Sequence, residues 1–407
     1  MTAGGRIRIL ADDLTGSADS GVAFARGGVR VVLTLDPGRA GARTDRVTVI
    51  DTDTREASSA VSYAAIRTLA LQIDRHDHVL KKIDSLLRGQ IASELAALRA
   101  VHPERLVIVA PAVPAVGRLT KGGAVLLGGP GRWQPGRADA PQAASPAQVA
   151  DQLGDGPVRA IGLDAVRSGT HGLTSLLGAG AVAGAMAVCD AVAEDDLDRI
   201  VRAGLSLRRP VLWVGAAGLA AALARALLAG RAPDAPAGTP RTASPLVIIG
   251  SPSPVAHEQV HALVSQGAQW IGLEAGELLT MSPEERGRQG AAISGRARGI
   301  PTVVSIIGDL HLAARPAIAA ALGEVCAPAV ADAEVAVMAG GATARAVLTG
   351  AGVTSLRLLG ELQPGVILTR AAGVHRQLHV ITKSGSFGDR TTLVRLAAAA
   401  TQPKGIS

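Results

Sequence analysis

Cysteine and aromatic residues are scarce in this chain. The two cysteines, Cys189 and Cys326, lie far apart among apolar residues, which argues against a disulfide framework and against a zinc site built on thiolates. Three Trp, one Tyr and two Phe in 407 residues make base stacking on aromatic platforms an unlikely basis for nucleic-acid binding. The core must therefore be built from Ala, Val, Leu and Ile, packed through many small contacts.

Long apolar runs and blocks of like charge are also missing from the sequence. No apolar stretch reaches membrane-spanning length without charged or turn residues, and no secretory signal precedes the first strand-like run, so we expect a cytoplasmic protein. The 41 Lys and Arg exceed the 34 Asp and Glu and give a net charge of +7. Because the basic residues are scattered, we expect small anions as partners, not nucleic acid or membrane. We expect a homo-oligomer only because homo-oligomers are common among proteins in general.

What the sequence does contain is a repeated alternation of strand and helix. Short Val-, Ile- and Leu-rich runs are each followed by a Gly- or Asp-containing turn and an Ala-rich helical pattern. This alternation predicts an α/β fold with mostly parallel sheets flanked by helices. Strands are predicted at residues 6–10, 29–35, 47–50, 78–83, 105–110, 158–163, 185–190, 211–215, 246–250, 302–307, 334–339 and 377–383.

The length and two proline- and glycine-rich segments predict two domains. A chain of 407 residues is too long for one ordinary core. Residues 231–245, RAPDAPAGTPRTASP, have no apolar face and predict a linker between a first domain, 1–230, and a second, 246–407. Residues 128–146 predict a long loop. We expect the active site in the cleft between the two domains.

The first strand is followed by two adjacent carboxylates in the segment ADDLTGSAD, residues 11–19. The carboxyl edge of a parallel sheet is where ligands bind. Asp12 and Asp13 could accept a proton from a hydroxyl and orient it, although one of them could instead cap the following helix. The segment DTDTR, residues 51–55, adds Asp53 and Arg55, and Arg suits bidentate capture of a carboxylate. A solvated loop with an internal ion pair is the alternative for this segment.

A third polar turn, KKIDSLLRG at residues 81–89, combines cationic and acidic side chains with a hydroxyl. It contains Lys82, Asp84, Ser85 and Arg88, and Arg118 follows the next strand after a proline-rich turn. A ligand that carries a carboxylate and several hydroxyls needs such a mixture of donors and acceptors. The alternative is a capped helix with surface charges.

Three glycine-rich turns in the second half follow predicted strands. Their backbone N–H groups and helix starts are suited to phosphate, and their glycines let the backbone approach a nucleotide. One such turn is weak evidence, but three in one domain predict a nucleotide site. None matches the Walker or GxGxxG pattern. The nucleotide-binding candidates are Ser251, Ser253, Gly340, Gly341, Ala342, Thr343, Lys383, Gly385 and Gly388.

Taken in order, these motifs, together with CDAVAEDDL at residues 189–197, resemble the four-carbon acid sugar kinase family, which includes 3-oxo-tetronate, D-threonate and D-erythronate kinases. The resemblance runs from about Leu10 to Leu393. It implies a sugar-acid-binding first domain, a nucleotide-binding second domain, and transfer of the γ-phosphoryl group of ATP to a terminal hydroxyl. For such a transfer we expect Mg²⁺ as a bridge between phosphate oxygens, held largely by ATP and water. The substrate side implied by the motifs is Asp12, Asp13, Asp53, Arg55, Lys82, Asp84, Arg88 and Arg118.

Three departures from the family pattern bear on these expectations. Ala342 stands where the family has an acidic residue, Leu86 replaces a hydroxyl residue, and the 128–146 loop lacks aromatic and acidic character. We expect Asp13 to be the catalytic base, with Asp12 as the second candidate. A non-catalytic sensor of sugar acid and nucleotide is one alternative. A nicotinamide-dependent oxidoreductase is another, which should show the missing GxGxxG turn.

Overall fold

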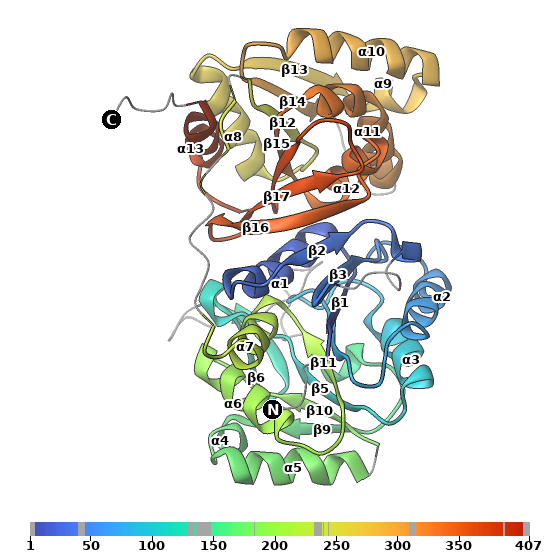
Figure 1. Ribbon diagram of the computed structural model, residues 1–407, viewed down its shortest axis with the longest axis vertical. Helices are drawn as coiled ribbons and strands as arrows, with labels where there is room; N and C mark the ends of the chain where they lie inside the picture. The colour runs from blue at the N-terminus through green and yellow to red at the C-terminus, as the bar shows by residue number, and fades with distance from the viewer. Residues whose placement is uncertain are drawn as a thin grey trace. The chain divides into compact units, whose positions relative to one another are not determined.

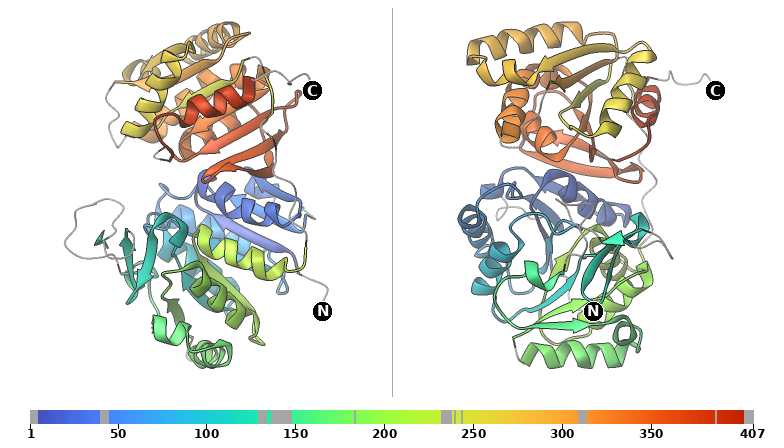
Figure 2. Two further views of the ribbon diagram at one scale, coloured as in Figure 1. Left: turned by 90° about the vertical axis from the view of Figure 1, so that its left-hand side faces the viewer. Right: turned by 180° about the vertical axis from the view of Figure 1, so that it is seen from behind.

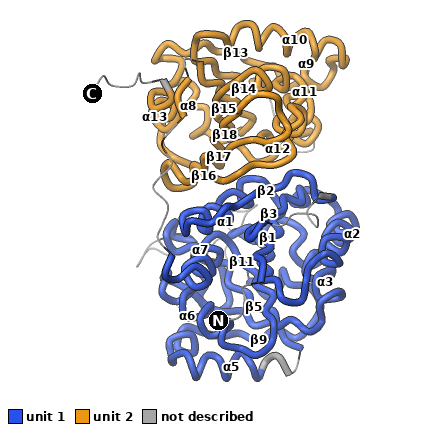
Figure 3. Tube along the Cα trace, viewed as in Figure 1, with its two compact units in different colours: residues 1–234 blue, residues 235–407 orange. Residues whose placement is uncertain are grey.

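The computed structural model of the chain describes residues 5–39, 45–128, 134–135, 148–182, 184–231, 238, 240–242, 244–308, 314–385 and 387–401. The chain divides into two compact units, Met1–Asp234 and Ala235–Ser407 (Figure 3). Most of the predicted 128–146 loop, and much of the predicted 231–245 linker, lie outside the described residues. Each unit is described below by itself.

Unit 1 is built on a parallel sheet with strand order β2-β3-β1-β4-β11-β5-β10-β9. All neighbouring strands in this order pair in parallel. Most of the strands are buried along their whole length, because helices cover both faces of the sheet. The strands are β1 (Ile7–Ala11), β2 (Val31–Thr34), β3 (Val47–Asp51), β4 (His78–Lys82), β5 (Leu106–Ala110), β9 (Val158–Ile161), β10 (Met186–Cys189) and β11 (Val211–Gly215).

Helices lie on both faces of this sheet, as can be followed in Figure 1. They are α1 (Leu14–Arg26), α2 (Ser59–Ala70), α3 (Ile91–Val101), α4 (Leu163–Val166), α5 (Thr170–Val182), α6 (Glu194–Leu205) and α7 (Ala217–Leu227). Helices α2 and α3 pack together on one face, and α1, α7 and α6 pack in a row on the other. The connections alternate strand and helix, so the predicted layering follows directly from the sequence pattern.

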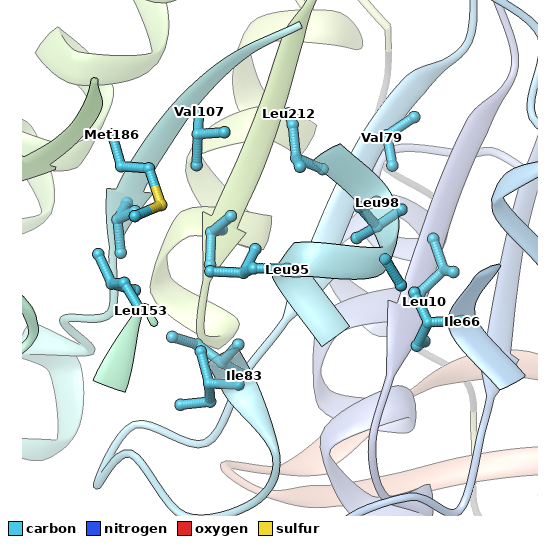
Figure 4. Close-up of a cluster of buried hydrophobic side chains, with 14 of the residues drawn as sticks. Leu10, Ile66, Val79, Ile83, Leu95, Leu98, Val107, Leu153, Met186 and Leu212 are labelled. Atoms are coloured by element: carbon cyan, nitrogen blue, oxygen red, sulfur yellow. The ribbon is translucent and has the colours of Figure 1, made fainter. Parts of the chain in front are cut away.

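The core between the sheet and helices α2 and α3 is almost entirely aliphatic. Leu10, Val79 and Leu212 project from the strands and meet Ile66 and Leu95 from the two helices (Figure 4). All five side chains are buried. Full burial of such a side chain stabilises the fold by about 1.5–3 kcal/mol, so this cluster holds the strand ends that carry the polar turns in fixed positions.

A small antiparallel sheet of β6 (Arg118–Lys121), β7 (Ala124–Leu127) and β8 (Gln134–Pro135) is added to unit 1 after β5. It was not among the predicted strands. The turn between β6 and β7 is formed by Gly122 and Gly123, which both have positive φ angles. Two consecutive residues with positive φ are typical of a tight hairpin turn, and glycine adopts this conformation without steric cost.

Unit 2 has a sheet with strand order β13-β14-β12-β15-β18-β17-β16. Pairing is parallel from β13 to β18, whereas β17 pairs antiparallel with both β18 and β16. The strands are β12 (Leu246–Ile249), β13 (Gln269–Glu274), β14 (Thr302–Ile307), β15 (Val335–Ala339), β16 (Ser355–Gln363), β17 (Val366–Ala372) and β18 (His379–Lys383).

The helices of unit 2 also divide between the two faces of its sheet (Figures 1 and 2). They are α8 (Pro254–Ser265), α9 (Ala275–Thr280), α10 (Pro283–Arg296), α11 (Arg315–Asp332), α12 (Gly341–Gly350) and α13 (Thr392–Thr401). Helix α8 packs against α13, and α11 packs between α10 and α12. The prediction of an α/β fold with mostly parallel sheets flanked by helices is confirmed.

A search of the described helices for one long and apolar enough to cross a lipid bilayer finds none.

Candidate active site

The polar turns of unit 1 follow three neighbouring strands. β3, β1 and β4 lie side by side in the sheet, and they are followed by the turns that begin at Thr52, Asp12 and Ile83. After β1 the chain crosses to one side of the sheet, toward β2, and after β4 it crosses to the other, toward β5. Ligands of open α/β sheets bind at such a switch point, outside the carboxyl ends of the strands.

Arg55 joins the two adjacent carboxylates that follow β1. Its Nε donates to Oδ2 of Asp12 at 2.8 Å and its Nη2 to Oδ1 of the same carboxylate at 2.8 Å, so the pair is bidentate. Nη2 also donates to Oδ1 of Asp13 at 2.6 Å. Burial alone would raise the pKa of Asp12, but the Arg55 guanidinium outweighs it and lowers that pKa below its usual value. The contact with Arg55 therefore favours the ionised form of Asp12.

Asp13 is the N-cap of α1. Its Oδ1 accepts from the backbone N–H of Gly16 at 3.0 Å, and its Oδ2 accepts from the hydroxyl of Thr15. The capping role that the sequence left open is thus present together with the contact to Arg55. Each carboxylate oxygen of Asp13 already accepts at least one hydrogen bond within the protein.

Asp53 lies two residues before Arg55 in the same turn. It is exposed and has a φ of 52°, a conformation that Asp tolerates better than most residues. Its backbone N–H donates to Oδ1 of Asp51 at 3.3 Å. The structure places Asp53 at the predicted strand edge, and its contact with substrate stays a prediction.

The two lysines at the end of β4 have different surroundings. Lys81 is fully buried and pairs with Glu94 of α3 at 2.9 Å, so its charge is neutralised inside unit 1. Lys82 donates to the carbonyl oxygen of Ile83 at 2.8 Å and forms no ion pair within the described residues. A Cβ placed on Gly16 would lie 2.7 Å from the Lys82 ammonium. Gly16 therefore leaves the space into which Lys82 projects.

The turn after β4 is held by a second bidentate pair. Arg88 donates through Nε and Nη2 to Asp84 at 3.0 and 2.8 Å. Burial would raise the pKa of Asp84, but the hydrogen bond from Arg88 lowers it well below its usual value. Ser85 accepts a short hydrogen bond from Arg118 of β6. Four predicted substrate residues, Asp84, Ser85, Arg88 and Arg118, are thus brought together around one turn.

Sequence reasoning missed the residue that fixes the hairpin carrying Arg118. Asp190, which directly follows β10, accepts from the backbone N–H groups of Gly122 and Gly123 at 2.7 and 2.9 Å. It is buried, so these bonds are shielded from water and hold the β6–β7 turn against the main sheet. The motif CDAVAEDDL contained this Asp, but its partner glycines lie far away in the sequence.

A second missed residue is Asp19 of α1. It is half-buried, and its charge interacts with Lys82, Asp13 and Arg118. Asp19 closes the segment ADDLTGSAD that drew attention to Asp12 and Asp13. The sequence carried no signal for this position, because Lys82 and Arg118 come from other strands.

In unit 2, the three predicted glycine turns also follow neighbouring strands. β12, β15 and β18 lie side by side. A Cβ added to Gly250 would lie 2.0 Å from Oγ1 of Thr343, and one added to Gly385 would lie 2.0 Å from Oγ of Ser251. The turn at Gly250 and Ser251 therefore touches the turn that contains Thr343. The turn at Gly385 touches Ser251. Glycine at both positions is what allows this close approach.

The second turn, at Gly340, leads directly into α12. Gly340 is the N-cap with a φ of 105°, which only glycine adopts readily. Ala342 is exposed in the first turn of the helix, so the absence of a carboxylate leaves no gap in the packing. Ser253 is the N-cap of α8, and its backbone N–H donates to Ser251 Oγ at 3.3 Å. Two helix N-termini thus begin at this edge of the sheet, and their partial positive charge favours anions.

Lys383 ends β18 and is almost fully buried, with 1% of its surface exposed. Its ammonium donates to the carbonyl oxygen of Gly385 at 3.4 Å and meets no carboxylate among the described residues. Burial lowers its pKa to about 8. Gly388, further along the turn, has a φ of 86°. The segment is fixed by Gln259 of α8, which donates to the carbonyl oxygens of Phe387 and Asp389.

The described residues hold no group of three or more His, Cys, Asp or Glu side chains able to bind a metal ion. Mg²⁺ in kinases is held mainly by phosphate oxygens and water, with one or two carboxylates. A Mg²⁺ held by phosphate oxygens would need no protein cage among the described residues, and its binding stays a prediction.

Comparison with known proteins identifies both halves of the chain. A family model described as a sugar-binding N-terminal domain matches residues 7–223, and one described as a nucleotide-binding C-terminal domain matches residues 246–393. A D-threonate kinase of Cupriavidus necator is 34% identical over 98% of this chain and 99% of its own length. The chain belongs to the four-carbon acid sugar kinase family. The predicted membership and the predicted enzyme class, a phosphotransferase, are confirmed.

A further relative agrees with this family assignment, and two solved structures share the fold. A 3-oxo-tetronate kinase of Methylobacterium radiotolerans is 30% identical over 93% of this chain and 95% of its own length. A crystal structure of a Haemophilus influenzae protein superimposes with a TM-score of 0.70 at 20% identity, covering 96% of this chain and 99% of its own. A crystal structure of a Salmonella typhimurium protein superimposes with a TM-score of 0.75 at 22% identity, covering 96% of this chain and 98% of its own. These two structures establish the fold alone.

Proposed function

We propose that this member of the family transfers the γ-phosphoryl group of ATP to the terminal hydroxyl of a four-carbon sugar acid of the threonate, erythronate or 3-oxo-tetronate class. The observation that carries the proposal is the convergence of three glycine turns at one sheet edge of unit 2, beside the buried cation Lys383. Cations of unit 1 at the corresponding edge of its own sheet supply the anion site for the acid. Relatives named as kinases of all three acids support the substrate class.

We assign residues 1–230 to binding the sugar acid and residues 246–407 to binding the nucleotide, joined by the 231–245 linker. Lys82 and Arg118 form no ion pair within the described part of unit 1, so their charge is available to the carboxylate of the acid. The full substrate set is Asp53, Arg55, Lys82, Asp84, Ser85, Arg88 and Arg118. The full nucleotide set is Ser251, Ser253, Gly340, Gly341, Ala342, Thr343, Lys383, Gly385 and Gly388.

The residues of this chain contribute by positioning and by charge neutralisation, which are the main demands of phosphoryl transfer. In unit 2, the N-terminus of α12 and Lys383 would contact the phosphates. In unit 1, Asp84 and Ser85 would accept hydrogen bonds from the hydroxyls of the acid. Mg²⁺, when bound to ATP, neutralises the phosphate oxygens. The predicted location of the site between the two domains stays a prediction.

An assay of ADP release over a panel of threonate, erythronate and 3-oxo-tetronate tests the proposal. We expect ADP release that depends on the presence of one of these acids. ATP binding without acid-dependent ADP release would instead support the non-catalytic sensor. Turnover of a nicotinamide cofactor by the protein would support the oxidoreductase.

Replacing Arg88 with Ala should raise the KM for the acid by about tenfold and leave the KM for ATP nearly unchanged. The reason is that the Arg88 guanidinium, with 49% of its side chain exposed, faces the turn that holds the predicted substrate residues. Steady-state kinetics with each substrate varied in turn measure both constants. Arg199→Ala is the matched control, because Arg199 makes an exposed pair with Asp195 on α6. An equal rise in both KM values would contradict the placement of Arg88.

Replacing Lys383 with Met should weaken ATP binding by between about 10-fold and 100-fold, the effect of losing a charged hydrogen bond. The lowered pKa of about 8 adds a pH dependence, because the amine is charged below that value and neutral above it. ATP affinity of the unaltered protein should therefore fall as pH rises through about 8, and the fall should be absent in the variant. Calorimetric titration with ATP measures both effects, with Lys121→Met, an exposed site on β6, as control. Equal pH dependence in the two proteins would exclude a phosphate contact by Lys383.

A further inference from the structure

Asp19 lies on the face of α1 that is turned toward the cations of the site. Gly16, one helical turn earlier, has its Cβ position 2.7 Å from the Lys82 ammonium. Residues three apart lie on the same face of a helix, one above the other. The charged groups that act on Asp19 are Lys82 at the end of β4, Asp13 at the start of α1 and Arg118 on β6. The carboxylate of Asp19 thus lies at the edge where the sugar acid is proposed to bind.

Among the described residues, Asp19 differs from Asp12, Asp13 and Asp84 in having no hydrogen-bond or ion-pair partner. Asp12 accepts hydrogen bonds from Nε and Nη2 of Arg55. Asp13 accepts hydrogen bonds from Arg55, Gly16 and Thr15. Asp84 is held by Arg88 in the same bidentate manner as Asp12. Within the described residues, by contrast, Asp19 forms neither a hydrogen bond nor an ion pair. Its oxygens are therefore available to a substrate hydroxyl.

The surroundings of Asp19 also make it a better proton acceptor than Asp12 and Asp84. The pKa of Asp19 is raised to about 6: burial is the largest cause, the nearby Asp13 charge adds to the rise, and Lys82 and Arg118 oppose it. A general base works best when its pKa lies near the working pH. The carboxylates of Asp12 and Asp84 have lowered pKa values and are weak bases for that reason.

We propose that Asp19 is the catalytic base of the phosphoryl transfer, and that Asp13 positions the start of α1 and Arg55 instead of taking the proton. This inference rests on the proposed function. In the step, the O–H bond of the acid's hydroxyl breaks and its proton passes to a carboxylate oxygen of Asp19. The hydroxyl oxygen forms a bond to the γ-phosphorus, while the bond from that phosphorus to the β–γ bridging oxygen breaks. ADP leaves with that electron pair, and Asp19 later releases its proton to water.

The test compares Asp19→Asn with Asp13→Asn in the assay of acid-dependent ADP release, across a range of pH. We expect Asp19→Asn to lower kcat by about 10²- to 10⁴-fold, the usual contribution of a general base. The kcat/KM of the unaltered protein for the acid should fall as pH drops below about 6, and this fall should disappear in Asp19→Asn. Asp13→Asn should lower kcat as well but keep the fall. Asp164→Asn, an exposed site on α4, is the matched control and should stay within twofold of the unaltered protein.

Thermal unfolding shows whether a loss of activity in Asp19→Asn reflects misfolding. The folded state raises the pKa of Asp19 from 3.8 to about 6, so the ionised carboxylate destabilises the fold at pH values above 6 and ceases to do so as pH falls toward 3.8. The neutral amide removes this penalty. The Tm of Asp19→Asn should therefore equal or exceed that of the unaltered protein at neutral pH, and the difference should shrink in acid.

The outcomes separate failure of this inference from failure of the proposed function. If the unaltered protein releases ADP with an acid, and Asp19→Asn keeps near-normal kcat with the same fall at low pH, Asp19 is not the base. If the fall disappears only in Asp13→Asn, the proton goes to Asp13. If the unaltered protein phosphorylates no four-carbon acid, the proposed function fails and the role of Asp19 fails with it.

Discussion

Replacing Arg55 with Met should abolish measurable phosphoryl transfer and lower the free energy of unfolding by about 3 kcal/mol, the usual cost of leaving a buried charge unpaired. Arg55 holds two carboxylates at once: Asp12 at 2.8 Å through both Nε and Nη2, and Asp13 at 2.6 Å. The side chain of Asp12 is 3% exposed, so water cannot replace the lost guanidinium. Denaturant unfolding and the ADP-release assay measure the two effects.

A double variant shows whether the lost stability comes from the unpaired Asp12 charge. Asp12→Asn combined with Arg55→Met should recover part of the stability, because the amide carries no charge to leave unpaired, but it should not recover activity. Arg167→Met is the matched control. Arg167 also binds a buried carboxylate, Asp196, in a bidentate manner, but it is 48% exposed and lies outside the site. Arg167→Met should lower the free energy of unfolding less than Arg55→Met does, and it should leave kcat unchanged. Stability unchanged in Arg55→Met would show that the pair contributes nothing.

The second large effect is expected at the point where two glycine turns of unit 2 touch. Replacing Gly385 with Ala should raise the KM for ATP by between about 5-fold and 100-fold, since overpacking of this kind costs about 1–3 kcal/mol. The added methyl group would lie 2.0 Å from Oγ and 2.5 Å from Cβ of Ser251. Ser251, its backbone, or the turn after β18 must move to relieve the overlap. The KM for the acid should change little, because the displaced groups belong to the nucleotide set.

Gly295→Ala is the control for that substitution. Gly295 is an exposed glycine of α10 in the same unit, and its Cβ position has no neighbour within 4 Å. Alanine there should be neutral or stabilise the fold by up to about 1 kcal/mol. A KM for ATP that stays normal in Gly385→Ala would mean that phosphate does not bind at the turn after β18.

The location of the polar turns could be predicted from the sequence, because this prediction required only the direction of the strands. Asp12 and Arg55 were both candidates for the site, and parallel strands bring their turns to one edge. Their bidentate pairing could not be predicted, because it depends on β3 lying beside β1. Asp19 was missed for a similar reason. The groups that surround it, Lys82 and Arg118, come from β4 and β6. No sequence pattern within α1 indicates that they lie near Asp19.

The elements that the sequence did not reveal are those outside the strand-helix alternation. β16 and β17 form an antiparallel hairpin next to β18. β16 is interrupted by register shifts at Gly360 and Gln363, so its alternation of buried and exposed residues is irregular. β13 is an edge strand in which exposed Trp270, Gly272 and Glu274 alternate with buried Ile271 and Leu273, so it lacks the continuous apolar run of the central strands. A search for continuous apolar runs therefore could not separate these strands from loops.

The central claim is that a sugar acid and ATP react with each other on this chain. Phosphorus NMR of a mixture of the protein, ATP, Mg²⁺ and D-threonate, followed over time, tests it most directly, with erythronate and 3-oxo-tetronate in parallel samples. The account predicts a new phosphomonoester signal with at least one of the acids, growing in equal amount to ADP, and no inorganic phosphate. ATP that stays intact with all three acids, or that yields only ADP and inorganic phosphate, would contradict it.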